Sequence, residues 1–210
     1  MKKIYLSLLG VISIISASAQ LSVGVNANYT MYKGDFQRST PGAQIRVSYP
    51  FSDQMEGVLS FTYGIPIKQA SSTLVYDQYG NTLSVPSEVK SNFKTFNLLV
   101  HRTFVGDAET AGRFYGIAGF GYVLVNMKEA VTGSYDHTKY SPSELYSASA
   151  NGFTLNFGIG GSYNMGSAVL FGEAGLGLPA NKVNDQYVEN VIPAHFIFNA
   201  GVKIPLGSNE

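Results

Sequence analysis

The clearest regularity along the chain is an alternation of apolar and polar residues with a period of two. In the segment 194–206, every second residue from Ala194 to Leu206 is apolar, and His195, Asn199 and Lys203 lie between them. The segments 21–31 and 153–163 show the same pattern. Alternation over about ten residues predicts a β-strand with one apolar and one polar face. A helix would need apolar residues at spacings of three and four, and the chain after the N-terminal leader lacks that pattern.

Five further segments alternate less strictly and are also expected to be strands, at 42–51, 55–67, 93–104, 113–126 and 168–179. Strands of about ten residues, tilted by about 40°, cover an apolar band about 25 Å tall. An even number of such strands fits a barrel that begins and ends on the same side of a membrane. The sequence therefore predicts an all-β fold, an eight-stranded antiparallel up-and-down transmembrane β-barrel.

The connections between these segments alternate in length. Short connections are expected at 52–54, 106–112 and 164–167, and long ones at 33–41, 68–92, 127–152 and 180–193. Outer-membrane barrels combine short periplasmic turns with longer extracellular loops. The alternation predicts that the long connections lie on the extracellular side.

The N-terminus has the pattern of an export signal. Two lysines precede an apolar run from Ile4 to Ile15, and the small residues Ala17-Ser18-Ala19 follow it. This arrangement predicts a cleaved signal peptide at residues 1–19 and a mature barrel domain at 20–210. The alternative is an anchoring helix, but the apolar run is shorter than the roughly 20 residues that a membrane-spanning helix needs.

Composition agrees with an exported membrane barrel. Charged residues make up only 13% of the chain, whereas soluble domains usually carry about 25%. The net charge is zero, and the absence of a basic stripe argues against a nucleic-acid partner. Cysteine is absent, so disulfides cannot stabilise the mature chain.

Four charged residues identify the face that points inward. A lysine or arginine on the lipid face at mid-depth costs about 2–4 kcal/mol. Arg46, Glu56, Glu173 and Lys203 have the parity of the polar faces, and we expect them to form an interior ion-pair cluster. Such a cluster could be a structural plug whose charges satisfy one another, which we favour, or part of a proton or ion path.

Aromatic residues gather where the strands are expected to leave the apolar band. Girdles of this kind flank the lipid-facing band of membrane barrels, although aromatics also favour strands in general. The expected girdle residues are Tyr49, Phe51, Phe104, Phe114 and Tyr163 near the short turns, and Tyr29, Tyr63, Phe93, Tyr122, Phe153 and Phe196 near the long loops.

With its alternating strands 21–31, 153–163 and 194–206 and its glycine-rich run 116–121, the chain resembles the small outer-membrane β-barrel domains of Gram-negative bacteria, such as the OmpA transmembrane domain and the OmpX barrels. The resemblance covers essentially the whole mature chain. It implies a monomer in the outer membrane, surrounded by lipid and lipopolysaccharide and assembled by the barrel insertion machinery.

No catalytic, cofactor or metal motif is recognisable in the sequence. We therefore expect a non-enzymatic protein without a cofactor, which has a structural role or interacts through its extracellular loops. The long loops 68–92 and 127–152 could bind a surface ligand, because tyrosines there lie among small polar residues. These tyrosines are Tyr76, Tyr79, Tyr135, Tyr140 and Tyr146.

Two alternatives belong to other classes of protein. A lipid-modifying outer-membrane enzyme would need a histidine with a nearby serine and carboxylate, and the histidines available are His101, His137 and His195. A soluble periplasmic barrel of lipocalin type would need an apolar interior and a polar exterior. A wide pore is not expected, since side chains fill the interior of an eight-stranded barrel.

Overall fold

The computed structural model describes residues 21–33, 39–107, 110–142, 145–180, 184–185, 188–189, 192 and 194–206. The expected signal peptide at 1–19 lies outside the described residues and remains a prediction. Within the described part, no helix is long and apolar enough to cross a membrane.

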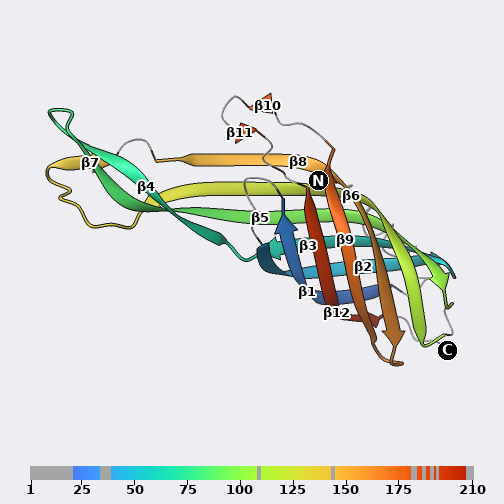
Figure 1. Cartoon of the computed structure of the whole chain (residues 1–210). Helices are drawn as coiled ribbons and strands as arrows, with labels where there is room; N and C mark the ends of the chain where they lie inside the picture. Colours follow the sequence, from blue (N-terminus) through green and yellow to red (C-terminus); the bar gives the residue numbers. More distant parts are fainter. Residues whose placement is uncertain are drawn as a thin grey trace, which may run out of the picture.

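Eight antiparallel strands form a closed ring (Figure 1). Each strand pairs with its neighbours along the chain, and pairing between the first and last strands closes the sheet. All eight expected strands are present, and the short turns lie where the sequence placed them. The ring consists of β1 (Ser22–Tyr32), β2 (Ser39–Ser52), β3 (Met55–Gly64), β5 (Thr82–Val105), β6 (Gly112–Val131), β8 (Ser147–Asn164), β9 (Val169–Pro179) and β12 (His195–Pro205).

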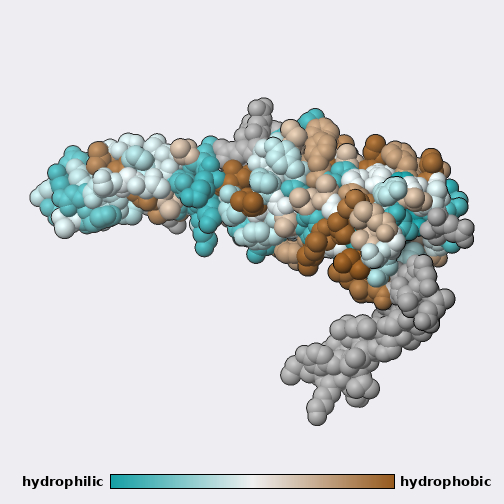
Figure 2. All heavy atoms as spheres, turned by 90° about the horizontal axis from the view of Figure 1, so that it is seen from below, coloured by the Kyte–Doolittle hydropathy of each residue, from teal (hydrophilic) through white to brown (hydrophobic). Residues whose placement is uncertain are grey.

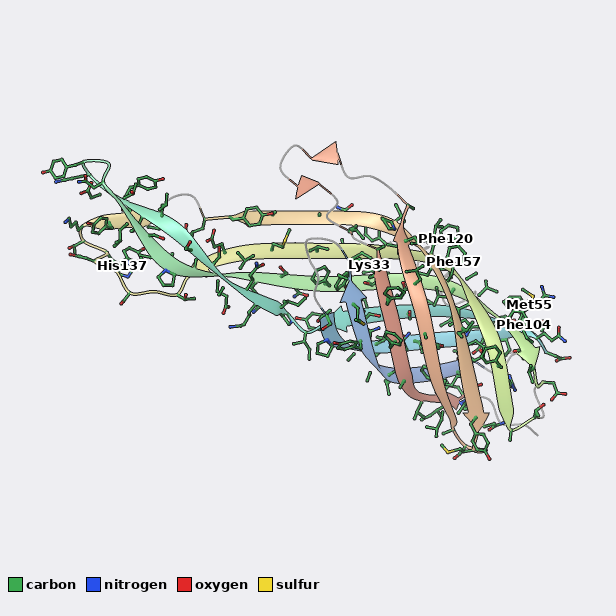
Figure 3. All side chains as sticks on the ribbon, viewed as in Figure 1. Lys33, Met55, Phe104, Phe120, His137 and Phe157 are labelled. Atoms are coloured by element: carbon green, nitrogen blue, oxygen red, sulfur yellow. The ribbon has the colours of Figure 1, made fainter. Side chains whose placement is uncertain are left out.

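The alternation of the sequence becomes an alternation of exposure. Along β1, buried and exposed residues alternate at every position. Asn26 and Asn28 are buried inside the ring, whereas Val25 is 61% exposed on its outer surface. Figure 3 shows Phe120 and Phe157 on the outside of the barrel in the same way. The polar faces thus line the interior and the apolar faces form the exterior, as the sequence predicted.

Strands β5, β6 and β8 continue well beyond the ring and carry a sheet that we call the arm (Figure 1). In the arm, β4 (Ile67–Asp77) pairs with the first half of β5, and β7 (Tyr140–Pro142) pairs with the end of β4. The apolar side chains of Val75 and Val85 are buried within it.

The prediction that 68–92 and 127–152 are loops is therefore wrong for most of their length. The strands there could not be recognised from the sequence for two reasons. Pro86 argues against a strand because proline is rare inside sheets, and the many serines and threonines leave no apolar face. In the expected loop 180–193, β10 (Asn184–Asp185) and β11 (Val188–Glu189) form a short hairpin.

Candidate functional site

The most densely bonded part of the barrel interior is a buried ion pair between β2 and β9. Arg46 donates from Nη1 and Nη2 to the two carboxylate oxygens of Glu173, at 2.6 and 2.7 Å. Both side chains are only 3% exposed. Two parallel charge-assisted hydrogen bonds of this kind fix both the position and the orientation of the pair.

Neighbouring side chains add further hydrogen bonds to this pair. Tyr115 Oη donates to Glu173 Oε1 at 3.1 Å, and Asn199 Nδ2 donates to Oε2 at 3.0 Å. On the other side, Arg46 Nη2 also donates to Gln44 Oε1 at 2.9 Å. Such bonds help to offset the cost of burying the two charges, although Nε of Arg46 has no hydrogen-bond partner among the described residues.

Small residues make room for the pair. Gly24 on β1 lies directly opposite Arg46 on one side and Lys203 on the other. A Cβ at Gly24 would lie 3.0 Å from Cγ of Arg46 and 3.1 Å from Cβ of Lys203. Because such distances are tighter than most real Cβ contacts, glycine at this position gives the arginine side chain room to cross the interior toward β9.

The second ion pair lies nearer the short turns. Lys203 Nζ donates to both carboxylate oxygens of Glu56, at 2.6 and 2.8 Å. These side chains are 16% and 19% exposed, so this pair is less deeply buried than the first. The structure thus places all four expected residues inside the barrel, in two pairs that join β2 to β9 and β3 to β12. That these residues act as a structural plug remains our proposal.

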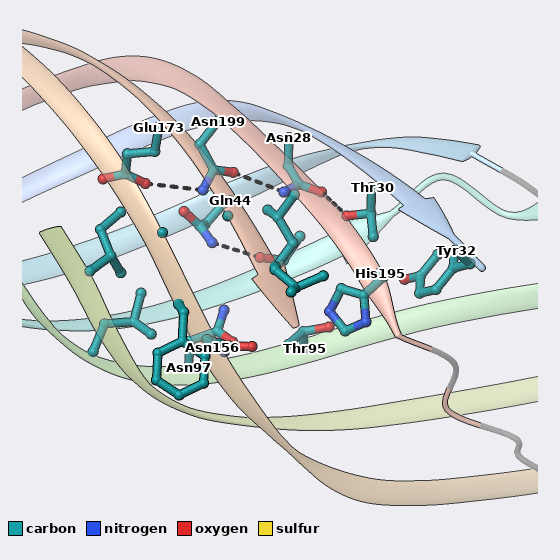
Figure 4. Close-up of a pocket in the computed structure, with 18 residues that line it drawn as sticks. Asn28, Thr30, Tyr32, Gln44, Thr95, Asn97, Asn156, Glu173, His195 and Asn199 are labelled. Carbon is teal, nitrogen blue, oxygen red and sulfur yellow. Dashed lines mark hydrogen bonds between the residues drawn. The ribbon is translucent and has the colours of Figure 1, made fainter. Parts of the chain in front are cut away.

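On the arm side of the ion pairs lies a small cavity of about 50 Å³, lined by both polar and apolar side chains (Figure 4). Asn28 donates to Asn199 Oδ1 at 2.8 Å on one wall, and Asn156 donates to Asn97 Oδ1 at 3.0 Å on strands β5 and β8. A cavity of this size holds a few water molecules. Sites for small organic ligands begin at about 300 Å³, so this cavity is too small for such a ligand.

An apolar layer lies inside the barrel next to the cavity, on the side of the arm. The rings of Tyr32 and Phe93 stack with centroids 4.4 Å apart, next to Val123, Val125, Met127 and Ile192. The expectation that Phe93 belongs to the outer girdle is wrong, since it is only 3% exposed. Phe93 is an even number of residues away from Asn97 and His101 on β5, and both of these point inward. This spacing could have placed Phe93 inside the barrel from the sequence alone.

The three histidines lie in different surroundings. His101 is buried in the barrel, stacked on Tyr115 with centroids 4.8 Å apart, and its Nε2 lies 4.0 Å from Glu173. His195 is also buried, near Tyr32. His137 lies on the arm, between β6 and β7 (Figure 3). Among the described residues, no group of three or more histidines and carboxylates could hold a metal ion.

The outer surface of the ring is apolar over its middle part (Figure 2). Leu98 and Phe120, on neighbouring strands, are each 61% exposed. At both ends of this belt lie exposed aromatic side chains, as expected for girdles. The exposed ones are Phe51, Phe104, Phe114 and Tyr163 near the short turns, and Tyr29, Tyr63, Phe153 and Phe196 near the arm.

The packing around Glu173 leads to a first mutational prediction. A Cβ at Gly160 would lie 2.5 Å from the Tyr115 ring and 2.9 Å from Cγ of Glu173. Gly160→Ala should therefore destabilise the barrel by about 1–3 kcal/mol, the usual cost of overpacking. At the matched control, Gly172→Ala, the nearest atom is 4.0 Å away, and stability should not change. Urea unfolding in lipid vesicles measures both, and equal stability of the two variants would contradict this account of the interior.

Comparison with solved structures identifies the fold. The chain is similar to a major outer membrane protein from Thermus thermophilus, with 15% identity and a TM-score of 0.61, over 89% of this chain and 98% of that one. It is similar to neisserial surface protein A, with 13% identity and a TM-score of 0.53, over 90% and 99% of the two chains. It is also similar to Ail, the attachment invasion locus protein of Yersinia pestis, with 14% identity and a TM-score of 0.51, over 89% and 98%.

No protein-family model and no curated protein matches the chain. The structural matches show that the chain has the fold of small outer-membrane β-barrel proteins. The fold class expected from the sequence, an eight-stranded antiparallel barrel, is confirmed.

Proposed function

We propose that this protein is a non-enzymatic integral barrel of the outer membrane, which acts at the cell surface through its arm. The observation that carries the proposal is the inverted polarity of the ring. Leu98 is 61% exposed while its neighbour Asn97 is 7% exposed, so the apolar side chains face outward and the polar ones inward. A barrel surface of this kind is stable only against lipid.

The arm supports a role outside the membrane. It extends past the apolar belt as an ordered sheet, and its surface in Figure 2 is mostly hydrophilic. At its tip, Asp77 accepts hydrogen bonds from the backbone N–H groups of Tyr79 and Asn81, and Asn81 also lowers the pKa of this carboxyl through its side chain. This turn holds Tyr79 at 79% exposure. A rigid, exposed tyrosine is well suited to recognition.

The names of two proteins with this fold agree with a surface role. One is a neisserial surface protein, and another is an attachment invasion locus protein. Their identity to this chain is only 13–14%, so they support the kind of role and name no partner.

The two alternatives from the sequence fit the geometry less well. A lipocalin-type barrel needs a large apolar cavity, whereas the cavity here is only about 50 Å³ and lies beside buried amides and an ion pair. A lipid-modifying enzyme needs its catalytic side chains on the lipid side, whereas His101 and His195 are 4% and 3% exposed inside the ring.

The membrane part of the proposal can be tested on a gel. The outer-membrane fraction is run in SDS with and without heating, since closed barrels of this kind keep their strand pairing in SDS until they are heated. We expect the chain in this fraction and a change of mobility on heating. Recovery of the chain in the soluble periplasm without a mobility change would contradict the proposal.

The surface part needs a separate test. In one variant, 69–89 and 129–147 are each replaced by a short turn, which removes the arm and leaves the ring. We expect this variant to keep the heat-dependent mobility change and to lose adhesion of whole cells to host or abiotic surfaces. Unchanged adhesion across these surfaces would remove the arm from the proposal.

A further inference from the structure

Three lysines lie side by side across the base of the arm. In the strand register, Lys68 of β4 is directly opposite Lys90 of β5, and Lys90 is directly opposite Lys128 of β6. All three are exposed. Directly opposite residues on neighbouring strands point to the same face of the sheet, and like charges in such positions repel one another.

The only carboxylate beside this row in the described register belongs to Glu88, which lies 3.0 Å from Lys68 Nζ. Glu129 has the opposite parity, and it accepts hydrogen bonds from Ser87 Oγ and the backbone N–H of Tyr146. Three positive charges therefore share one acidic neighbour, and Lys90 and Lys128 are the uncompensated members. The row has an excess of positive charge that an anion would balance.

The row faces the same way as the lipid-contacting belt. Lys90 has the parity of Phe96 and Leu98 on β5, both of which are exposed on the outer surface. Between the belt and the row, Lys94 lies over the ring of Tyr63 at 6.0 Å, and Asn92 donates to Tyr63 Oη at 3.3 Å. Figure 2 shows a strongly hydrophilic band where the arm leaves the barrel.

The height of the row places it at the membrane surface. Lys94 lies beside the girdle residue Tyr63 at the edge of the belt, so we count the height of the row from Lys94. Lys90 is four residues beyond Lys94, or about 13 Å along the strand and about 10 Å along the membrane normal at a tilt of about 40°. The headgroup region adds about 5–7 Å to each side of the hydrocarbon core. Lysine side chains bend readily toward such a boundary, so their ammonium groups reach the headgroups from this position.

We propose that Lys68, Lys90 and Lys128 form a binding site for the phosphate groups of lipid headgroups in the leaflet around the barrel. The site would hold the base of the arm against the membrane. This inference rests on the proposed outer-membrane location, because only an inserted barrel brings the row to headgroup level.

The test compares two double variants of equal charge. K90Q/K128Q removes the uncompensated lysines and keeps the Lys68–Glu88 pair. K33Q/K139Q removes two exposed lysines elsewhere on the same side of the membrane. Each folded mature chain is titrated in detergent micelles with diphosphorylated lipid A, with its monophosphorylated form and with inorganic phosphate, and bound lipid is measured by native mass spectrometry.

We expect the unmodified chain and K33Q/K139Q to bind diphosphorylated lipid A more tightly than the monophosphorylated form. K90Q/K128Q should lose this preference and bind about 30-fold more weakly, which corresponds to about 2 kcal/mol for two lysines. High salt should also weaken the binding of lipid A to the unmodified chain, because it screens the lysine charges.

Three results would overturn the inference: equal lipid binding by K90Q/K128Q and the unmodified chain, an equal loss in K33Q/K139Q, or displacement of the lipid by inorganic phosphate at matched phosphate concentration. The heat-dependent mobility change is recorded for every variant. If K90Q/K128Q shows the mobility change and binds lipid A as tightly as the unmodified chain, only this inference fails. If the unmodified chain shows no mobility change, the proposed function fails.

Discussion

Replacement of Arg46 by methionine should destabilise the barrel by about 3–5 kcal/mol, because it leaves the carboxylate of Glu173 buried without its partner. The guanidinium supplies two of the hydrogen bonds to that carboxylate, and the site is closed to solvent. Urea unfolding of the mature chain in lipid vesicles gives the free energy of unfolding.

Two control variants separate the buried charge from ordinary loss of contacts. Lys68→Met breaks an ion pair whose side chains are 63% and 31% exposed, and it should cost less than about 1 kcal/mol. The double variant R46M/E173L removes both charges and should recover most of the loss. If R46M were no less stable than K68M, or if the double variant were less stable than R46M, the interior pair would not have the structural role we propose.

Replacement of Leu98 by arginine should reduce stability in lipid by about 2–4 kcal/mol, because it places a charge at mid-depth on the lipid face. Leu98 lies between Phe96 and Val100 on the outer side of β5, and all three are exposed. The fraction of chain that folds into vesicles, read from the heat-dependent mobility change, should fall accordingly.

The matched control is Leu83→Arg, in the first half of the same strand. Leu83 is 42% exposed on the arm, where the proposed surroundings are water, and arginine there should have no measurable effect. Equal effects of the two substitutions would mean that the belt and the arm share one solvent, which contradicts membrane insertion.

The sequence was most informative where the environment differs sharply between the two faces of a strand. In β1 and β12, lipid on one side and a polar interior on the other force a strict period of two, so these strands could be placed to within two residues. In the arm, both faces meet a polar environment over most of β4, and its Ser- and Thr-rich sequence carries no comparable period. The strands there depend on pairing with β5, which a single sequence does not reveal.

The interior charges show a second limit. Parity placed Arg46 and Glu173 inside the barrel, but their pairing joins β2 to β9 across the two strands that close the ring. Which rows face each other depends on how the sheet is staggered when it closes, and the sequence pattern does not specify that stagger. Tyr115 and Asn199, which complete the pair, were missed for the same reason.

The most direct test of the central claim uses the absence of cysteine from the chain. Single cysteines at Leu98 and Leu83 can each carry a nitroxide spin label, and the folded chain in vesicles is then exposed to oxygen, which concentrates in lipid, and to a water-soluble nickel complex. We expect the label at position 98 to relax with oxygen alone and the label at position 83 to relax strongly with the nickel complex. If the label at position 98 responded to nickel as strongly as the one at position 83, the apolar belt would be in water and the account of a membrane-inserted barrel would be wrong.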